Sequence, residues 1–297
     1  MGLFAEGWNV AYRNKATGTI LSDDSTEFTV IKNTWRTWCA DPFVFEYDGE
    51  TYIFAEIFDY FKNYAGIGYC KYDKYKKSFS KWKLVIEENF HMSYPFIFAK
   101  DGDVYMMPET SENKSLIIYK AINFPDIWER YNDVLNDVSV VDTTIDNPCQ
   151  NVSLGLTYEI KDSSKWELKI FELNNGKITW GKNNPVSTDE EFARPGGYFF
   201  DYDGKSIRVS QDCLKSYGYA LNFFEILDFS LDNLSEKLVK KISPEDISLD
   251  KSMKITGVHT YNSSKNFEVV DVKSYMHNFV YVLLRLLRKI KRIVKRG

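Results

Sequence analysis

The sequence predicts an all-β fold, a five-bladed β-propeller followed by a C-terminal amphipathic α-helix. The first observation is a phrase that recurs about every fifty residues: ADPFVFEYDGETYIFAE at 40–56, SYPFIFAKDGDVYMMPE at 93–109 and ARPGGYFFDYDGKSIRVSQD at 193–212. The second is the spacing of its prolines, because Pro42 and Pro95 are 53 residues apart, 53 more reach Pro148, and 47 more reach Pro195. Strand–turn–strand units repeating about every 40–50 residues are typical of propellers. A degenerate copy, GVHTYNSSKNFEVVDV at 257–272, makes the fifth unit.

Each unit has the pattern of a hairpin that starts at the proline. Aromatic and β-branched residues fill two short runs around the Asp-Gly pairs at 48–49, 101–102 and 203–204. Asp-Gly between apolar runs is a strong signal for a tight hairpin. Proline has no N–H donor, so it suits the start of a strand. Five such units account for residues 1–272 as one propeller domain, and residues 273–297 are expected to form a separate basic helix.

The residue before each proline is expected to begin the innermost strand of its blade. In chain order these residues are Asp41, Tyr94, Asn147, Arg194 and, by position, His259. Innermost strands line the central channel of a propeller. Unpaired polar groups are costly in a core. The gathering of these five residues therefore predicts a water-filled pocket at one mouth of the channel. The alternative is that the Asp and Asn side chains only cap turns.

Composition and charge restrict the class of partner. Hydrophobic residues make up 44% of the chain, enough for a large core, and the four cysteines show no CxxC spacing that would predict a zinc site or a disulfide framework. After Asp271 there are eight basic residues and no acidic ones, which leaves 30 basic against 42 acidic residues in the body. An acidic body argues against nucleic acid as a ligand. Since no secretory signal pattern is seen, we expect a cytoplasmic protein.

The segment YMHNFVYVLLRLLRKIKRIVKRG predicts an amphipathic helix with a cationic face. Apolar residues recur at i, i+3, i+4 and i+7, and Arg285 interrupts the apolar stretch, so it is too short to span a bilayer. Such a helix fits the anionic inner face of the cytoplasmic membrane. A helix packed on the propeller or on a partner, and a nucleic-acid-binding arm, are the alternatives. The residues expected to contact the membrane are Phe279, Leu283, Arg285, Leu286, Leu287, Arg288, Lys289, Ile290, Lys291 and Arg292.

Two histidines fall at the predicted level of the mouth. His91 precedes the start of the second unit in HMSYP, and His259 stands at the start of the fifth in GVHTYN. A lone histidine is more often structural than catalytic, but their equivalent repeat positions give a functional role equal weight with a structural one for the pair. Three histidines in the whole chain, without clustered spacing, predict no metal site.

Carboxylates recur at the far end of the hairpins. Asp41 and Glu109 are our preferred catalytic pair, because adjacent blades bring their inner strands together and paired carboxylates are what glycosidic chemistry needs. The alternative is that these acids cap turns or pair with Arg194. Aromatic residues near the mouth could stack on sugar rings. The recurring carboxylates are Glu56, Glu109, Asp212 and Asp271, and the aromatic candidates are Trp38, Tyr94, Tyr198 and Tyr217.

Taken together, WCADPFVFEYDGETYIFAE, HMSYPFIFAKDGDVYMMPET, ARPGGYFFDYDG, SQDCLKSYGYAL and GVHTYN resemble the N-terminal domain of plant glucosamine inositolphosphorylceramide transferases, which also occurs alone in bacteria. GWNVAYRN and the VVDTT at 140–144 match the same pattern, so the resemblance covers about residues 7–272 and leaves out the basic tail. It implies a five-bladed propeller related to glycoside hydrolase family 43. For bacterial members it implies a place in surface-polysaccharide assembly, and thus sugar transfer rather than degradation.

The resemblance carries over to the site only in part. Asp41 matches the first-blade aspartate that acts as the base in family-43-like hydrolases. Those enzymes also need a glutamic acid on a later blade, where this chain has Arg194, and no third-blade aspartate is obvious beyond Asp142 or Asp146. This departure weakens a hydrolase assignment. An arginine beside histidines suits a phosphate-bearing donor, because guanidinium binds phosphate oxygens in a bidentate way.

The leading hypothesis is a membrane-peripheral glycosyltransferase that moves a sugar from a nucleotide-sugar donor to a lipid-linked or surface-polysaccharide acceptor. Asp41 or Glu109 would be the base, while Arg194, His91 and His259 would hold the donor phosphates. We expect no cofactor besides the donor; metal dependence stays open, with no metal as the expectation. A non-catalytic glycan-binding propeller and a family-43-like hydrolase are the alternatives. The residues expected to bind substrate are Arg194, Gln211, Asp212, Tyr217, Glu56, Tyr94 and Asn147.

Overall fold

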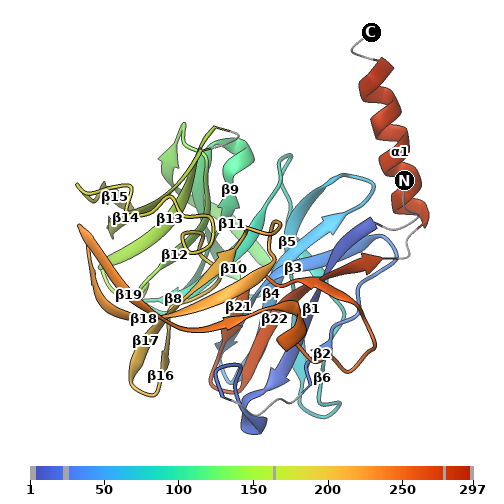
Figure 1. The fold of residues 1–297 in the computed structure, drawn as a ribbon, viewed down its shortest axis with the longest axis horizontal. Coiled ribbons are helices and arrows are strands. Elements are labelled where there is room, and N and C mark those ends of the chain that lie inside the picture. The colour runs from blue at the N-terminus through green and yellow to red at the C-terminus, as the bar shows by residue number, and fades with distance from the viewer. Residues whose placement is uncertain (1–4, 23–26, 163–164, 277–278, 295–297) are drawn as a thin grey trace.

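The computed structural model confirms the predicted fold, a five-bladed β-propeller with one C-terminal helix (Figure 1). It describes residues 5–22, 27–162, 165–276 and 279–294. Five antiparallel sheets follow one another along the chain, and in the first four the innermost strand comes first. Three short 3₁₀ turns, η1 (Lys15–Thr17), η2 (Ser111–Asn113) and η3 (Pro244–Asp246), lie in the connections.

Blades 1 and 2 are consecutive meanders. Blade 1 contains β3 (Thr37–Tyr47), β4 (Glu50–Asp59), β5 (Tyr64–Asp73) and the short β6 (Ser78–Phe79) and β7 (Lys83–Ile86). Blade 2 contains β8 (Ser93–Lys100), β9 (Asp103–Thr110), β10 (Ser115–Asn123) and β11 (Ile127–Asn136). Their inner strands read as near-continuous apolar runs because both faces are covered by neighbouring sheets.

Blades 3 and 4 repeat the same order. Blade 3 contains β12 (Val140–Ile145), β13 (Val152–Asp162), β14 (Lys165–Asn174) and β15 (Lys177–Trp180). Blade 4 contains β16 (Phe200–Tyr202), β17 (Lys205–Asp212), β18 (Ala220–Ser230) and β19 (Asn233–Ile242).

Blade 5 is built from both ends of the described chain. The short β20 (Ile255–Gly257) and β21 (Tyr261–Ser263) pair with β22 (Phe267–Met276), which pairs with β1 (Ala5–Asn14), and β2 (Thr29–Val30) lies outermost. The register of β1 on β22 runs from Ala5 opposite Met276 to Asn14 opposite Phe267. This pairing closes the ring, and it carries the propeller four residues beyond the predicted boundary at 272.

The Asp-Gly hairpins are confirmed. Asp48, Asp101 and Asp203 have φ of 49°, 53° and 54°, and the glycines that follow also have positive φ. Two consecutive residues with positive φ define the type I′ turn, whose twist matches that of the paired strands. Each turn follows its innermost strand. The residue before the proline lies at the opposite end of that strand.

A β-bulge recurs near the start of the innermost strand in blades 1, 2 and 3. The register shifts by one extra residue between Ala40 and Phe43 in β3, between Ser93 and Phe96 in β8, and between Val141 and Thr144 in β12. The bulges hold Asp41, Tyr94 and Asp142 in the left-handed region, with φ of 50°, 44° and 49°. A bulge bends its strand and redirects a side chain. Three blades therefore place one residue each at the same level of the channel.

The predicted start of the innermost strand in blade 3 is wrong. Pro148 continues the proline spacing, but β12 ends at Ile145, so Asn147 follows the strand instead of opening it. Asp142 takes the position equivalent to Asp41 and Tyr94. The bulge, rather than the proline, defines the repeat in this blade.

The helix α1 (Phe279–Val294) leaves the propeller on the side of blade 1 (Figure 1). Tyr281 stacks on Tyr60 with ring centroids 4.3 Å apart, and the Arg288 guanidinium donates to the backbone oxygen of Phe61 at 3.2 Å and to Asn63 Oδ1 at 2.7 Å. These contacts all come from the β4–β5 connection. No helix among the described residues is long and apolar enough to cross a membrane.

Candidate functional site

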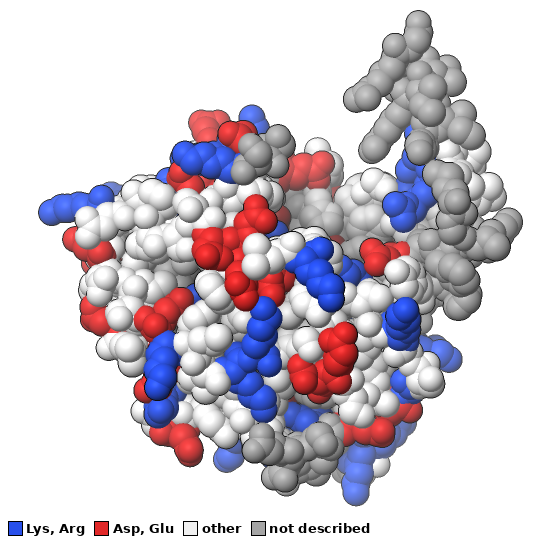
Figure 2. All heavy atoms as spheres, in the orientation of Figure 1, with Lys and Arg blue, Asp and Glu red and all other residues white. Residues whose placement is uncertain are grey.

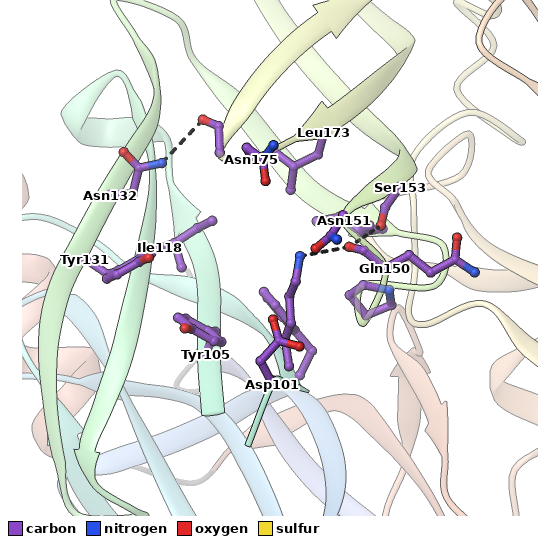
Figure 3. Close-up of a pocket in the computed structure, with 15 residues that line it drawn as sticks. Asp101, Tyr105, Ile118, Tyr131, Asn132, Gln150, Asn151, Ser153, Leu173 and Asn175 are labelled. Atoms are coloured by element: carbon purple, nitrogen blue, oxygen red, sulfur yellow. Dashed lines mark hydrogen bonds between the residues drawn. The ribbon is translucent and has the colours of Figure 1, made fainter. Parts of the chain in front are cut away.

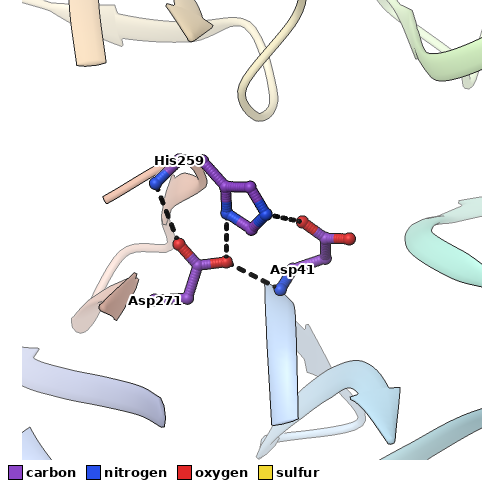
Figure 4. A group of neighbouring side chains, drawn as sticks. All are labelled: Asp41, His259 and Asp271. Carbon is purple, nitrogen blue, oxygen red and sulfur yellow. Dashed lines mark hydrogen bonds and ion pairs between the residues drawn. The ribbon is translucent and has the colours of Figure 1, made fainter. Parts of the chain in front are cut away.

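A buried triad joins blades 1 and 5 at the mouth of the channel (Figure 4). His259 Nδ1 lies 2.7 Å from Asp271 Oδ2, and His259 Nε2 lies 3.6 Å from Asp41 Oδ1. The imidazole thus bridges two carboxylates. Asp271 Oδ2 also accepts from the backbone N–H of Asp41 at 2.9 Å, and Thr260 Oγ1 donates to Asp41 Oδ1 at 2.8 Å. The network fixes the orientation of the Asp41 carboxyl group.

Burial sets the protonation of this triad. Desolvation, reinforced by the negative charges of Glu56, Asp271 and Asp142, raises the pKa of Asp41 to about 8, although the nearby His259 opposes the shift. Desolvation lowers the pKa of His259, but the charges of Asp271 and Asp41 outweigh it and the net shift is upward. A carboxyl group whose pKa lies near the working pH is suited to act as a general base.

Aromatic residues cover the histidine of the triad. The Trp8 ring stacks on the His259 ring at 3.8 Å and 10°, and the Tyr217 ring meets His259 edge-on at 5.4 Å. Gly218 passes so close that a Cβ there would lie 2.8 Å from Trp8 and 2.9 Å from His259. Trp8 was not identified as a site residue from the sequence, because it arrives from β1, far from the repeats.

A second histidine–carboxylate pair lies between blades 1 and 2. His91 Nε2 is 3.3 Å from Glu56 Oε1. Desolvation lowers the pKa of His91, but the hydrogen bond to Glu56 and the charges of Glu56, Glu109 and Asp41 raise it to about 9. Glu109 accepts from Ser111 Oγ at 2.6 Å, and burial together with the charge of Asp142 raises the pKa of Glu109 to about 7. Protonated His91 thus places a positive charge beside the predicted acids.

An ion pair links blades 3 and 4. Arg194 Nε donates to Asp142 Oδ2, and Gln211 Nε2 donates to the same oxygen at 3.0 Å. The side chains of Arg194 and Asp142 are only 12% and 3% exposed. Of the guanidinium nitrogens of Arg194, only Nε bonds to another described residue. The two terminal nitrogens can therefore donate to a ligand. The VVDTT segment was the sequence signal for Asp142.

A small aromatic cavity opens beside this ion pair. Its volume is about 180 Å³, and the Arg194 guanidinium lies 5.8 Å from the centroid of Trp166 and 5.0 Å from that of Tyr217. Tyr158 and Trp166 come from β13 and β14, strands whose sequence gave no indication of the site. Glu190 also lines the cavity. The aromatic walls suit a sugar ring, and Arg194 suits a phosphate attached to it.

Three predicted substrate-binding residues lie away from the open mouth. Tyr94 is fully buried, and its hydroxyl group is 2.8 Å from Thr144 Oγ1, so it forms part of the channel floor. Asp212 points to Lys241 Nζ at 2.7 Å, because alternation along β17 sends Gln211 inward and Asp212 outward. Asn147 donates to Asp146 at the far end of blade 3. The structure brings together the other eight mouth residues, which are Asp41, Glu56, His91, Glu109, Arg194, Gln211, Tyr217 and His259.

Asp41, His259 and Asp271 offer ligand atoms within 4.8 Å of one another, a spacing that could hold a metal ion. These atoms already bond to each other and to backbone N–H groups: Asp271 Oδ1 accepts from His259 at 3.1 Å and from Thr260 at 3.0 Å. The prediction that the protein uses no metal stays a prediction.

Known sequences are similar to most of this chain. The family model described as "Glucosamine inositolphosphorylceramide transferase 1, N-terminal" matches residues 24–282. The protein named glucosamine inositolphosphorylceramide transferase 1 of Arabidopsis thaliana is 29% identical over 242 residues, which are 79% of this chain and 31% of that protein. A relative of the same name in Oryza sativa subsp. indica is 25% identical over 221 residues, 72% of this chain and 29% of that protein. The chain thus spans less than a third of these curated relatives.

Solved structures share the fold at low identity. A GH62 hydrolase in complex with xylotriose superposes with a TM-score of 0.54 at 9% identity, covering 82% of this chain and 94% of that one. The Bombyx mori GH32 β-fructofuranosidase gives 0.53 at 12%, covering 77% and 53%, and the α-L-arabinofuranosidase CtGH43 of Clostridium thermocellum gives 0.51 at 14%, covering 78% and 81%. These likenesses show the propeller fold alone.

Proposed function

Because this chain belongs to the family of glucosamine inositolphosphorylceramide transferase N-terminal domains, we propose that it transfers a sugar from a nucleotide-sugar donor to a lipid-linked glycan or glycolipid. The observation that carries the proposal is the Asp41 carboxyl group, buried at the mouth, held by Thr260 and by the N–H of Tyr94, and with a pKa of about 8. The relatives' name supports a transferase over a hydrolase. Blade 4 also carries Arg194, and not a carboxylic acid, at the position before its proline.

The proposed reaction has three parts. Asp41 takes the proton of the acceptor hydroxyl group, whose oxygen forms a bond to the anomeric carbon of the donor. The bond from that carbon to the donor phosphate breaks, and the nucleoside diphosphate leaves with the electron pair. His91, protonated beside Glu56, and the terminal nitrogens of Arg194 stabilise the negative charge on the leaving phosphate. The cavity beside Trp166 holds the transferred sugar ring.

A thermal-shift screen tests this function. We expect one nucleotide sugar to raise the melting temperature of the wild type, because a ligand that binds only the native state stabilises it by mass action. In the Arg194→Ala variant the shift should disappear. Stabilisation by free glycans alone, with no nucleotide sugar effective, would contradict sugar transfer and favour a glycan-binding module.

The pH profile is expected to be a narrow bell. Activity requires Asp41 deprotonated, so kcat/KM should rise with pH through about 8, and it requires His91 protonated, so kcat/KM should fall above about 9. Because Glu56 raises the pKa of both groups, the Glu56→Gln variant should move both limbs to lower pH. The alkaline limb should move further, since Glu56 also accepts a hydrogen bond from His91. An alkaline limb unchanged in Glu56→Gln would remove His91 from the mechanism.

The surface of α1 supports a peripheral membrane position at the inner face of the cytoplasmic membrane. Tyr281 and Arg288 face the propeller, whereas Leu283, Leu286 and Leu287 are 45%, 38% and 49% exposed. An apolar stripe facing water on a cationic helix is typical of interfacial helices. Five more residues were predicted to touch the membrane, and their side chains lie outside the part of the chain whose side chains the structure describes. They are Phe279, Lys289, Ile290, Lys291 and Arg292.

Two more aromatic residues extend this surface. Trp35 and Phe61 are 68% and 46% exposed, their ring centroids lie 5.8 Å apart, and Phe61 adjoins the contacts of Arg288. Over the face of the propeller shown in Figure 2, basic and acidic side chains are interspersed, which fits a body without nucleic-acid affinity.

The membrane role predicts a large effect from two substitutions. Leu283→Glu/Leu287→Glu should weaken binding to vesicles containing anionic lipid at least about 100-fold, because each leucine buried in lipid contributes about 1.5–3 kcal/mol. The measurement is vesicle cosedimentation. Leu227→Glu, which alters a leucine 60% exposed on blade 4, is the matched control and should bind like the wild type. Equal binding by all three proteins would exclude α1 as the membrane contact.

A further inference from the structure

A second cavity lies between blades 2 and 3, at the other end of the channel strands (Figure 3). Its volume is about 570 Å³. Tyr94, whose N–H bonds to Asp41, lies near the start of β8, and Lys100 ends that strand beside this cavity. Six residues of strand at about 3.3 Å each separate the two by about 20 Å. A ligand in this cavity therefore occupies a different place from the substrate at the mouth.

The blade 2 wall is aromatic over an apolar floor. The Tyr105 and Tyr131 rings meet edge-on with centroids 5.3 Å apart, and Tyr131 is 58% exposed. Phe98, Ile118 and Ile145 are buried beneath them. An exposed tyrosine face next to a dry floor is suited to the C–H face of a sugar ring.

The blade 3 wall supplies hydrogen-bonding groups that are free. The side-chain amides of Gln150, Asn151 and Asn175 have no hydrogen-bond partner among the described residues, and each amide can both donate and accept. The charged residues of the lining are Lys100, whose Nζ donates to the Gln150 backbone oxygen at 2.9 Å, and Asp101. With one charge of each sign, the cavity favours neither an anion nor a cation. Its chemistry matches a neutral polyhydroxyl ligand.

The loop that carries Gln150 and Asn151 is already fixed. Besides the bond from Lys100, Cys149 Sγ donates to the Ala99 backbone oxygen at 3.2 Å, and Ser153 Oγ donates to the Asn147 backbone oxygen at 2.9 Å. Bonds across the gap tie blade 3 to blade 2. Since a preformed site loses little entropy on binding, the affinity available from a few amides and one ring is retained.

We propose that this cavity is a second glycan-binding site, which takes a neutral oligosaccharide of roughly two or three sugar units. The site is separate from the mouth and does not depend on sugar transfer there. It would hold a length of glycan on the propeller without contributing to the reaction.

The test is saturation-transfer NMR with the full chain and a panel of trisaccharides. Maltotriose, cellotriose and mannotriose are the neutral probes, and sialyllactose and a glucosamine trimer are the charged comparators. At least one neutral probe should bind with a dissociation constant in the millimolar range, about 1 mM. Tyr131→Ala and Asn151→Ala should each weaken it at least about tenfold, a change of roughly 1.4 kcal/mol. Tyr75→Ala, which alters a fully exposed tyrosine of blade 1, should leave binding unchanged.

The variants also separate this site from the mouth. Arg194→Ala should abolish stabilisation by the nucleotide sugar and keep trisaccharide binding, whereas Tyr131→Ala should do the reverse. Because Tyr131 is exposed, its loss should not alter the melting temperature. The proposal is overturned if no neutral probe saturates by about 10 mM, if charged probes bind as well, or if binding is lost in Arg194→Ala and kept in Tyr131→Ala.

Discussion

Asp41→Asn is expected to reduce turnover by about 10²–10⁴-fold, the usual contribution of a general base. The amide is nearly isosteric, and its oxygen can still accept from Thr260, so the fold should persist. The measurement is steady-state turnover with the donor found by the thermal-shift screen. Asp137→Asn, at an exposed residue whose φ of 60° asparagine also tolerates, is the matched control and should keep full activity.

The same substitution should alter stability with a defined pH dependence. The folded pKa of Asp41, about 8, is above the unfolded value, so the folded state binds the proton more tightly and loses stability as pH rises from about 4 to 8. Asparagine has no such proton. The melting temperature of Asp41→Asn relative to the wild type should therefore increase from pH 5 to pH 8, as measured by calorimetry at several values. Full turnover in the variant would contradict the role of the base, and a flat stability difference would contradict the raised pKa.

Arg194→Ala is expected to lower the free energy of unfolding by about 3–5 kcal/mol. Removing one partner leaves Asp142 as a buried, unpaired carboxylate, and that penalty exceeds the lost attraction. The double variant Asp142→Asn/Arg194→Ala should recover most of the stability, because the charge that needed compensation is gone. Donor binding should stay lost in both. Urea denaturation gives the stabilities.

A surface pair provides the comparison. Arg130 and Asp133 form an ion pair on β11 with side chains 47% and 32% exposed, and Arg130→Ala should cost less than about 1 kcal/mol. If Arg194→Ala is as mild as Arg130→Ala, the blade 3–blade 4 pair is not a structural link. If the double variant stays as unstable as the single one, Asp142 is not the cause.

The repeats made much of the fold and part of the site predictable. The Asp-Gly pairs indicated where the innermost hairpins turn, and the prolines in blades 1 and 2 follow the bulges that hold Asp41 and Tyr94. These local signals suffice where one residue pair determines the turn. The proline at 148 misled because the chain forms the same bulge at Asp142 without a proline, and a bulge leaves no fixed residue type in the sequence.

The site residues that were missed come from non-local contacts. Trp8 lies over His259 because β1 pairs with β22, and Trp166 reaches Arg194 from a third strand. Asp271 was recognised as a recurring carboxylate, but its bonds to His259 and Asp41 depend on the closed ring. Spacing within one repeat carries no information on such neighbours, since they are determined by how the sheets pack.

The pairing of β1 with β22 also has a consequence in time. Contacts between segments so far apart in sequence form slowly, because the entropy of closing the long loop must be overcome first. The stacked Trp8–His259 rings and the Asp271–Asp41 contact depend on blade 5, which is the last blade to assemble. A newly synthesised chain could hold four folded sheets and still be chemically inert. The proposed activity should therefore appear abruptly, when β1 pairs with β22. Any loosening of this pairing should abolish that activity before the other blades unfold.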